Sequence, residues 1–197
     1  MNRAQLKASA KEQIRGKIGI LFVIMLIVAV ITGALNAIPV VGSVASLVVS
    51  AALSLSHAHI YLELTRKNLS PSINDAFKGF SDIWPAFKVT FLTAILTSLW
   101  SLLFVIPGII KAIEYSMAIY ILAENPGKSS RECLKESKAM TYGHRMELFV
   151  LGLSFIGWAL LCGITFGIAS IWVVPYMNAT FANAYNNLKP AVPVEEN

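Results

Sequence analysis

Charged side chains are scarce in this sequence, and their scarcity excludes an ordinary soluble domain. Asp, Glu, Lys and Arg make up 14% of the 197 residues, against about 25% in a typical soluble protein. Hydrophobic residues make up 56%, and the mean hydropathy is +0.64. This composition is typical of a chain solvated by lipid, and the length allows one compact unit, an integral membrane domain over residues 1–197.

Cysteine and the common catalytic motifs are also scarce. The two cysteines, Cys133 and Cys162, lie in unrelated settings without a CxxC spacing, which argues against a disulfide framework and a zinc site. His57 and His59 point in different directions on a helix, so they are poorly placed for a shared metal. The sequence has no HExxH, P-loop or GxGxxG motif. We therefore expect no enzyme, no catalytic residue, no metal and no cofactor.

Long runs without charge are abundant and imply membrane helices. Residues 18–62 and 148–188 contain no Asp, Glu, Lys or Arg, and residues 89–123 are charged only at Lys111 and Glu114. A single helix over 18–62 would be about 68 Å long, whereas the hydrocarbon core is about 30 Å thick. Each run must fold back, with breaks predicted at 33–42, at Pro107-Gly108 and at 162–167. The sequence thus predicts an all-α polytopic bundle of six transmembrane helices.

The positions of the basic residues predict how these helices are oriented. In the six-helix arrangement all but one of the 16 Lys and Arg residues fall on one side, in the segments 1–17, 63–88 and 124–147 and at Lys189. Short loops rich in Lys and Arg stay in the cytoplasm. We expect a multi-pass protein of the cell membrane with both termini cytoplasmic, and a retained first helix rather than a cleaved signal peptide.

The polar linkers between the apolar runs resemble one another. The segment "RAQLKAS" (3–9) matches "RECLKES" (131–137), and "NDAFKGF" (74–80) lies between them; each places an apolar residue before a lysine. The spacing of about 60 residues predicts three parallel hairpin repeats, approximately 2–66, 68–124 and 125–188, followed by a short polar tail at 189–197.

Each linker also has the pattern of an amphipathic helix. In the second, apolar residues recur every three or four positions, and Ser72 with Asp75 fits a capping box; the apolar residues are Ile73, Phe77, Phe80, Trp84 and Phe87. In the first, Leu6, Ala10 and Ile14 share a face beside a basic one. These helices either lie in the headgroup region or pack on the bundle.

The charges at Lys111 and Glu114 have two interpretations. The pair shares one helix face, so the two side chains can meet. If the fourth helix begins at Gly108, Lys111 reaches the outer interface and Glu114 lies near a helix N-terminus. Alternatively the pair, beside Tyr115, lines a polar site that binds a headgroup, an ion or a proton. Pro175 frees a backbone carbonyl in the last helix, which is either a packing kink or, with Tyr176, part of the same site.

Several stretches resemble a known family. They are "IPGIIKAIEYSMAIYILAENP", an "S..ECLKES...GHR" helix, "LSFIGWALL", "GI..IWVVPY" and "F..AYNNL". Together they are similar to the bacterial membrane family catalogued as domain of unknown function 975. The family in turn looks like a distant relative of the membrane portion of some glycerophosphodiester phosphodiesterases. The resemblance implies a multi-spanning bacterial protein and supplies no reaction.

Two functions compete at this stage. The first is a non-catalytic membrane protein that acts as a lipid-interacting scaffold, regulator or stress-protection factor. The alternative is a small transporter or channel using a polar site near Lys111 and Glu114. The expected partners are membrane lipids and other membrane proteins. Nucleic acid is excluded, because the basic residues lie in short segments between apolar runs and no nucleic-acid motif is present.

Overall fold

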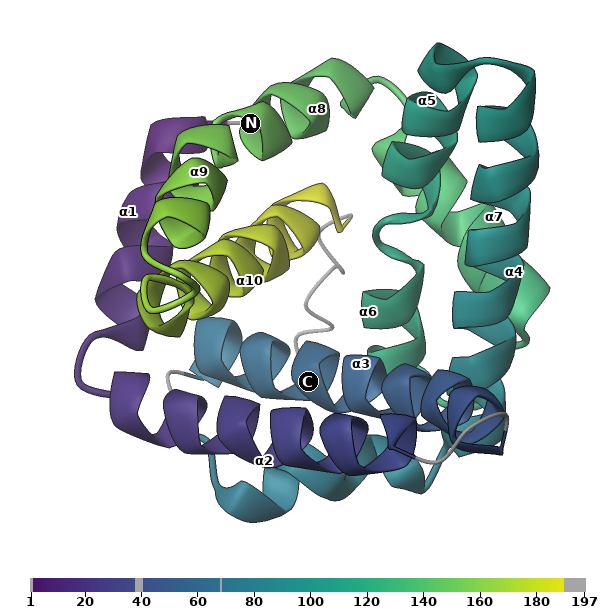
Figure 1. Cartoon of the computed structure of the whole chain (residues 1–197). Helices are drawn as coiled ribbons and strands as arrows, with labels where there is room; N and C mark the ends of the chain where they lie inside the picture. Colours follow the sequence, from purple (N-terminus) through teal and green to yellow (C-terminus); the bar gives the residue numbers. More distant parts are fainter. Residues whose placement is uncertain (1, 38–40, 68, 190–197) are drawn as a thin grey trace, which may run out of the picture.

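The structure is a computed structural model that describes residues 2–37, 41–67 and 69–189, and these residues form helices and no strand (Figure 1). The first group of helices is α1 (Arg3–Ile14), α2 (Ile18–Asn36) and α3 (Val41–Lys67). The second is the 3₁₀ helix η1 (Ile73–Phe80), α4 (Ile83–Leu103), α5 (Val105–Tyr115) and α6 (Ala118–Glu124). The third is α7 (Ser130–Thr141), α8 (Arg145–Leu153), α9 (Ile156–Ile164) and α10 (Ser170–Leu188). The prediction of an all-α chain is confirmed.

Within the described residues, five segments are long and apolar enough to cross a membrane: Ile18–Leu35, Ala45–Lys67, Ile83–Leu102, Val105–Glu124 and Arg145–Ile164. Large apolar side chains on these segments face outward, among them Leu26, Leu99 and Leu160. Such exposure is unfavourable in water and favourable in lipid. The prediction of a helical membrane protein is therefore supported by the arrangement of the helices as well as by composition.

Two predicted breaks coincide with turns. The chain leaves α9 after Ile164 and enters α10 at Ser170, and both Phe166 and Gly167 have positive φ angles, of 49° and 87°. Glycine adopts this conformation at little cost, which explains its place in the turn. Between α2 and α3 one helix stops at Asn36 and the next begins at Val41; residues 38–40 of the predicted break at 33–42 lie outside the described residues.

The third break differs from the prediction. The structure starts α5 at Val105 rather than at Gly108, because the extended conformation of Phe104 (φ −160°, ψ 144°) ends α4. Pro107 then sits in the first turn of α5, where its missing N–H is not needed for a helical hydrogen bond. Lys111 and Glu114 consequently lie about 1.7 and 2.5 turns into the helix, deeper than the prediction placed them.

The linkers form the short helices α1, η1 and α7. The capping box of Ser72 and Asp75 is confirmed at the start of η1, where the Ser72 backbone N–H donates to Asp75 Oδ2 at 2.7 Å. On η1 the predicted apolar residues Ile73 and Phe77 are exposed, while Ala76 and Gly79 are buried. On α1 the three apolar residues of the predicted face, Leu6, Ala10 and Ile14, are buried.

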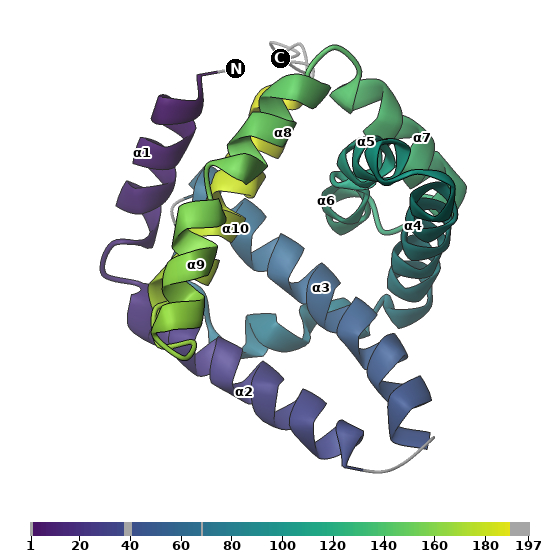
Figure 2. The same ribbon diagram turned by 45° about the horizontal axis from the view of Figure 1, so that its top comes forward.

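Each short helix packs on the second long helix of a neighbouring group. Helix η1 lies on α3, and α7 lies on α5 and α6. Helix α1 lies on α10, and α10 also contacts α2. The last helix therefore returns to the first, and the three groups surround a common centre (Figures 1 and 2). The tyrosines Tyr61, Tyr120 and Tyr185, from α3, α6 and α10, belong to the buried core there.

Candidate functional site

Glu114 lies on α5, and its buried carboxylate forms ion pairs with two cations. Its side chain is 3% exposed, and Lys111 Nζ lies 2.7 Å from Oε2. The Lys111 ammonium also lies 5.3 Å from the centre of the Trp100 ring and 5.9 Å from that of Tyr115. Attraction between the cation and these ring faces helps to hold Lys111 over the carboxylate. The structure thus places Lys111, Glu114 and Tyr115 close together, and their role in binding stays a prediction.

The second cation is Arg145, which the sequence analysis counted only among the basic residues of the segment 124–147. Its guanidinium lies 2.7 Å from Glu114 Oε1, and its Cζ lies 5.2 Å from the centre of the Tyr142 ring. Gly143, with a φ angle of 86°, turns the chain sharply between α7 and α8 and so presents Arg145 to α5. The only sequence signal was that Arg145 is the last cation before the uncharged run 148–188.

A serine of α7 forms hydrogen bonds with the backbone on both sides of the helix break that follows Glu114. Ser137, which is fully buried, donates from Oγ to the Glu114 carbonyl oxygen at 2.6 Å, and the same Oγ accepts from the Met117 backbone N–H at 3.2 Å. These backbone groups lack helical partners because α5 ends at Tyr115 and α6 begins at Ala118. One hydroxyl therefore satisfies both sides of the interruption.

Tyr176, the fourth predicted site residue, lies in a different place. Its ring packs against Phe155 and Trp158, with ring centres 5.4 and 6.2 Å away. In the part of the chain that the structure describes, no hydrogen bond or ring contact joins Tyr176 to Lys111 or Glu114. Pro175 beside it is buried within α10. Tyr176 therefore belongs to the wall between α9 and α10 rather than to the charge cluster.

A second carboxylate, that of Glu124, whose side chain is 9% exposed, joins the ends of α3, α6 and α10. Arg66 forms an ion pair with its Oε1, while Lys189 Nζ and the Tyr185 hydroxyl lie 2.8 and 2.6 Å from its Oε2. Arg66 also donates to Asn186 Oδ1 at 2.7 Å. The cluster lies beside a cavity of about 320 Å³. No local pattern indicated this cluster, because its members are up to 123 residues apart.

The chemistry available at the two clusters is electrostatic. Each carboxylate is matched by two cations, so each cluster carries one surplus positive charge and can hold an anion or fix two helices together. Among the described residues, His, Cys, Asp and Glu form no group of three that could hold a metal ion. The arrangement fits binding or structural roles for both clusters.

The chain was compared with known proteins. A family model described as "Protein of unknown function (DUF975)" matches it in two overlapping segments, residues 1–114 and 102–191. Neither the comparison with curated proteins nor that with solved structures found a match. The predicted likeness to the membrane portion of glycerophosphodiester phosphodiesterases stays a prediction.

Proposed function

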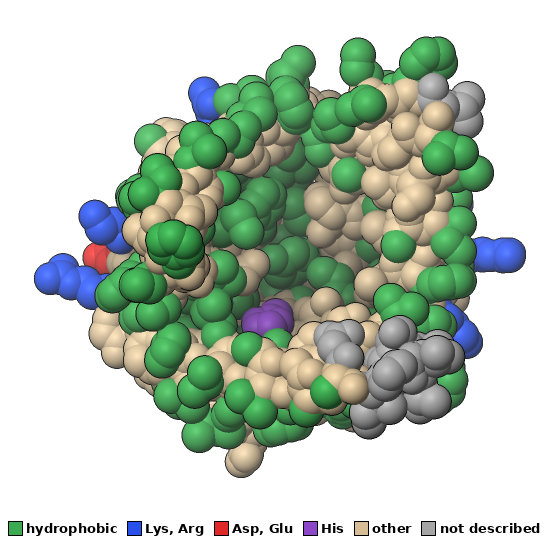
Figure 3. All heavy atoms as spheres, in the orientation of Figure 1, with side chains coloured by type: hydrophobic (Ala, Val, Ile, Leu, Met, Phe, Trp, Pro, Cys, Tyr) green, Lys and Arg blue, Asp and Glu red, His purple; other side chains and the backbone are tan. Residues whose placement is uncertain are grey.

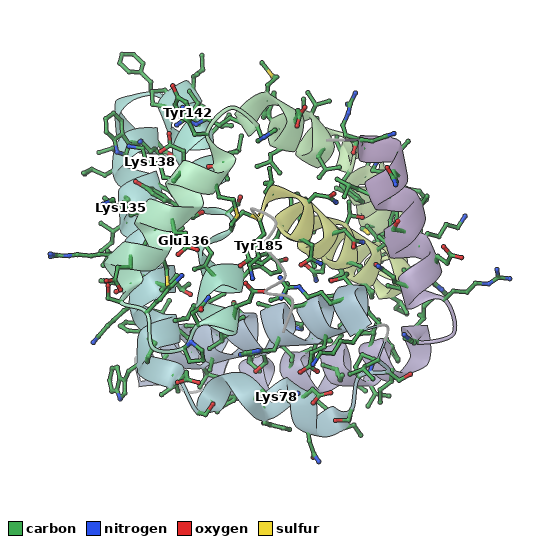
Figure 4. The ribbon with its side chains drawn as sticks, turned by 180° about the vertical axis from the view of Figure 1, so that it is seen from behind. Lys78, Lys135, Glu136, Lys138, Tyr142 and Tyr185 are labelled. Atoms are coloured by element: carbon green, nitrogen blue, oxygen red, sulfur yellow. The ribbon has the colours of Figure 1, made fainter. Side chains whose placement is uncertain are left out.

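The chain belongs to the DUF975 family of proteins of unknown function, and we propose that it is a non-catalytic membrane protein that acts as a lipid-interacting scaffold, regulator or stress-protection factor. The observation that carries this proposal is the separation of its surfaces. Hydrophobic side chains cover most of one face around a hollow, with Lys and Arg at the edge (Figure 3). From behind, Lys78 on η1 and Lys135 and Lys138 on α7 are seen (Figure 4). An apolar body with these lysines, and Glu136 beside them, on the rear side suits a bilayer with anionic headgroups on one side.

The proposal includes six membrane spans, with α10 as the sixth. Helix α10 has 19 residues, about 28 Å at 1.5 Å per residue, close to the thickness of the hydrocarbon core. Its asparagines lower its hydropathy, but Asn183 and Asn186 hydrogen-bond to Gln13 and Thr65 of neighbouring helices. Amides that bond to other helices do not have to face lipid.

Three parallel hairpin repeats are supported by positions that correspond in α3, α6 and α10. Each of these helices carries a core tyrosine: Tyr61, Tyr120 and Tyr185. Four residues later stand Thr65, Glu124 and Lys189, and these three belong to one network of hydrogen bonds and ion pairs through Tyr185, Asn186 and Arg66. Parallel repeats bring the ends of all three helices to the same membrane face, which agrees with cytoplasmic termini.

This proposal is tested by topology and flux together. Tags at the two ends should be reachable in permeabilised cells and not in intact cells. The purified protein should keep bound phospholipid in detergent. Liposomes that contain the protein should pass no ions or small solutes. Tags on opposite faces would contradict the arrangement of the spans. Solute flux above that of empty liposomes would contradict the scaffold.

The alternative, a small transporter or channel, is favoured by the buried Glu114. A carboxylate held between Lys111 and Arg145 within apolar helices is a typical place for an ion or proton to bind. Under this hypothesis liposomes containing the protein conduct, and the change Lys111→Ala/Glu114→Ala abolishes the flux. Under the scaffold hypothesis, liposomes that contain the unaltered protein and liposomes that contain the variant are equally impermeable to ions and small solutes.

A further inference from the structure

A cleft of about 860 Å³ lies where α1 and the start of α2 meet α9 and α10. Its volume is within the range of sites that bind small organic molecules, about 300–1,000 Å³. The cleft is separate from both carboxylate clusters, because its lining includes neither Glu114 nor Glu124. It does include Tyr176, the predicted site residue that the structure places away from Lys111.

One side of the cleft is charged. Lys11, Glu12 and Arg15, at the end of α1, line it and are exposed. Among the residues that the structure describes, neither Lys11 nor Arg15 forms an ion pair, in contrast with the cations at Glu114 and Glu124. The three side chains together carry one net positive charge. This part of the cleft can therefore receive one negative charge.

The opposite wall is aromatic and apolar. Trp158 of α9 and Trp172 of α10 are 44% and 54% exposed, and Tyr176 packs edge-on against Trp158. Indole and phenol rings combine a large apolar surface with one polar atom, so they are common where lipid headgroups meet acyl chains. Ile18, the first residue of α2, extends the apolar lining toward a candidate membrane span.

We propose that this cleft binds one anionic glycerophospholipid. The phosphate lies between Lys11 and Arg15, headgroup hydroxyls donate to the Glu12 carboxylate, and an acyl chain lies along Trp158 and Trp172. A lipid of charge −1 neutralises the surplus charge of the cleft, whereas a zwitterionic lipid leaves it unmatched. The proposal rests on the lipid-interacting function and makes it specific, since it names the lipid class and the site.

The site is tested by native mass spectrometry of the full chain in detergent, with phosphatidylglycerol and phosphatidylcholine added in equal amounts. We expect one phosphatidylglycerol to be retained in preference to phosphatidylcholine. Two variants address the cleft: Lys11→Gln/Arg15→Gln removes the cations, and Ala8→Phe narrows the cleft from an exposed position without changing charge. Each should weaken phosphatidylglycerol binding roughly tenfold or more.

The matched control is Lys88→Gln/Arg131→Gln, which removes two exposed cations, one on α4 and one on α7, that lie outside the cleft. It should bind phosphatidylglycerol as the unaltered protein does. Equal binding by the control and by either cleft variant overturns the site but leaves lipid interaction standing. Equal retention of the two lipids overturns the recognition of charge. Absence of bound lipid from every form overturns lipid interaction itself, and a lipid-free dimer assigns the cleft to a second copy.

Discussion

The Ser137 hydroxyl lies 2.6 Å from the Glu114 carbonyl oxygen and 3.2 Å from the Met117 backbone nitrogen. A single side chain of α7 thus bridges the interruption between α5 and α6. The same contact attaches α7 to the helix that carries the buried carboxylate. The geometry of the Glu114 cluster therefore depends on a residue that carries no charge.

Replacing Ser137 with alanine should destabilise the protein. The change leaves the buried Met117 N–H without its partner and leaves the Glu114 carbonyl only the long hydrogen bond from Thr141 Oγ1, at 3.5 Å, which together cost about 1–3 kcal/mol. Thermal or denaturant unfolding in detergent measures the loss. Ser54→Ala is the control, because Ser54 is exposed and its hydroxyl donates to the Ser50 carbonyl of the same helix. Similar stability of the two variants would show that the bridge at the break contributes nothing.

The stability of η1 should depend on pH through Asp75 and Lys78. Burial tends to raise the pKa of Asp75, but hydrogen bonds from Ser72 and Lys78 outweigh it and hold the pKa below 3.8. The hydrogen bond to Asp75, aided by Glu63, raises the pKa of Lys78 above 10.5 despite burial. The carboxylate's contribution is complete above pH 3.8 and is lost as the pH falls through its lower folded pKa. The ammonium's contribution is complete below pH 10.5 and is lost as the pH rises through its higher folded pKa.

The melting temperature of Asp75→Asn, followed against pH, tests this pair. Asparagine retains an oxygen for the Ser72 N–H but loses the charge that Lys78 meets. We expect the variant to be less stable than the unaltered protein at neutral pH and to show a smaller loss toward acid. Asp82→Asn is the control, since the Asp82 carboxylate accepts from the adjacent Ser81 hydroxyl. An unchanged acid limb in Asp75→Asn would rule out this origin of the pH dependence.

Cys133 should be unreactive in the folded protein. It is fully buried on α7, and burial raises the pKa of its thiol to about 11. At pH 7.5 roughly one thiol in 3,000 is then the reactive thiolate. With Cys162→Ser, N-ethylmaleimide should label Cys133 only after denaturation. With Cys133→Ser, it should label the partly exposed Cys162 without denaturation. Rapid labelling of native Cys133 would mean that α7 separates from α5 and α6.

The helices could be predicted from the sequence because helix formation and helix ends depend on residues that are close together in the chain. The uncharged runs, the capping residues at Ser72 and the glycine-containing turn at 162–167 act over a few positions, and all reappear in the structure. The start of α5 was misplaced because proline was treated as a helix breaker. In the structure it occupies the first turn, where it is tolerated.

The sites were predicted only as far as their residues are neighbours in sequence. Lys111 and Glu114 are three residues apart, and their ion pair follows from helix geometry. Arg145 completes that cluster from 31 residues away, and Arg66 meets Glu124 across 58 residues. Tertiary packing decides such contacts, and no local pattern encodes them. The same limit explains why Tyr176 was grouped with the wrong helix.

The two ends of the Lys111–Glu114 pair should differ sharply in importance. Glu114→Gln leaves Lys111 and Arg145 close together without their shared counter-charge, which costs about 3–5 kcal/mol when a buried pair is broken. Lys111→Gln leaves Glu114 still paired with Arg145 at 2.7 Å and should cost much less. Unfolding of both variants in detergent gives the comparison. Equal losses would mean that Arg145 does not share the carboxylate.

Finally, the close approach of α4 and α5 should depend on Gly108. A methyl group added there would lie 2.0 Å from Ser101 Oγ and 2.7 Å from Ser101 Cα. Because one of these atoms is backbone, the helices must separate to accommodate alanine, and Gly108→Ala should lower stability by about 1–3 kcal/mol. Gly152→Ala is the matched control on α8, since nothing lies within 4 Å of its added methyl group; removing glycine from a helix should leave its stability equal or higher by up to about 1 kcal/mol. If Gly108→Ala and Gly152→Ala have the same melting temperature, α4 and α5 do not meet at Gly108. The position of Lys111 and Glu114 relative to the turn between α4 and α5 must then be revised.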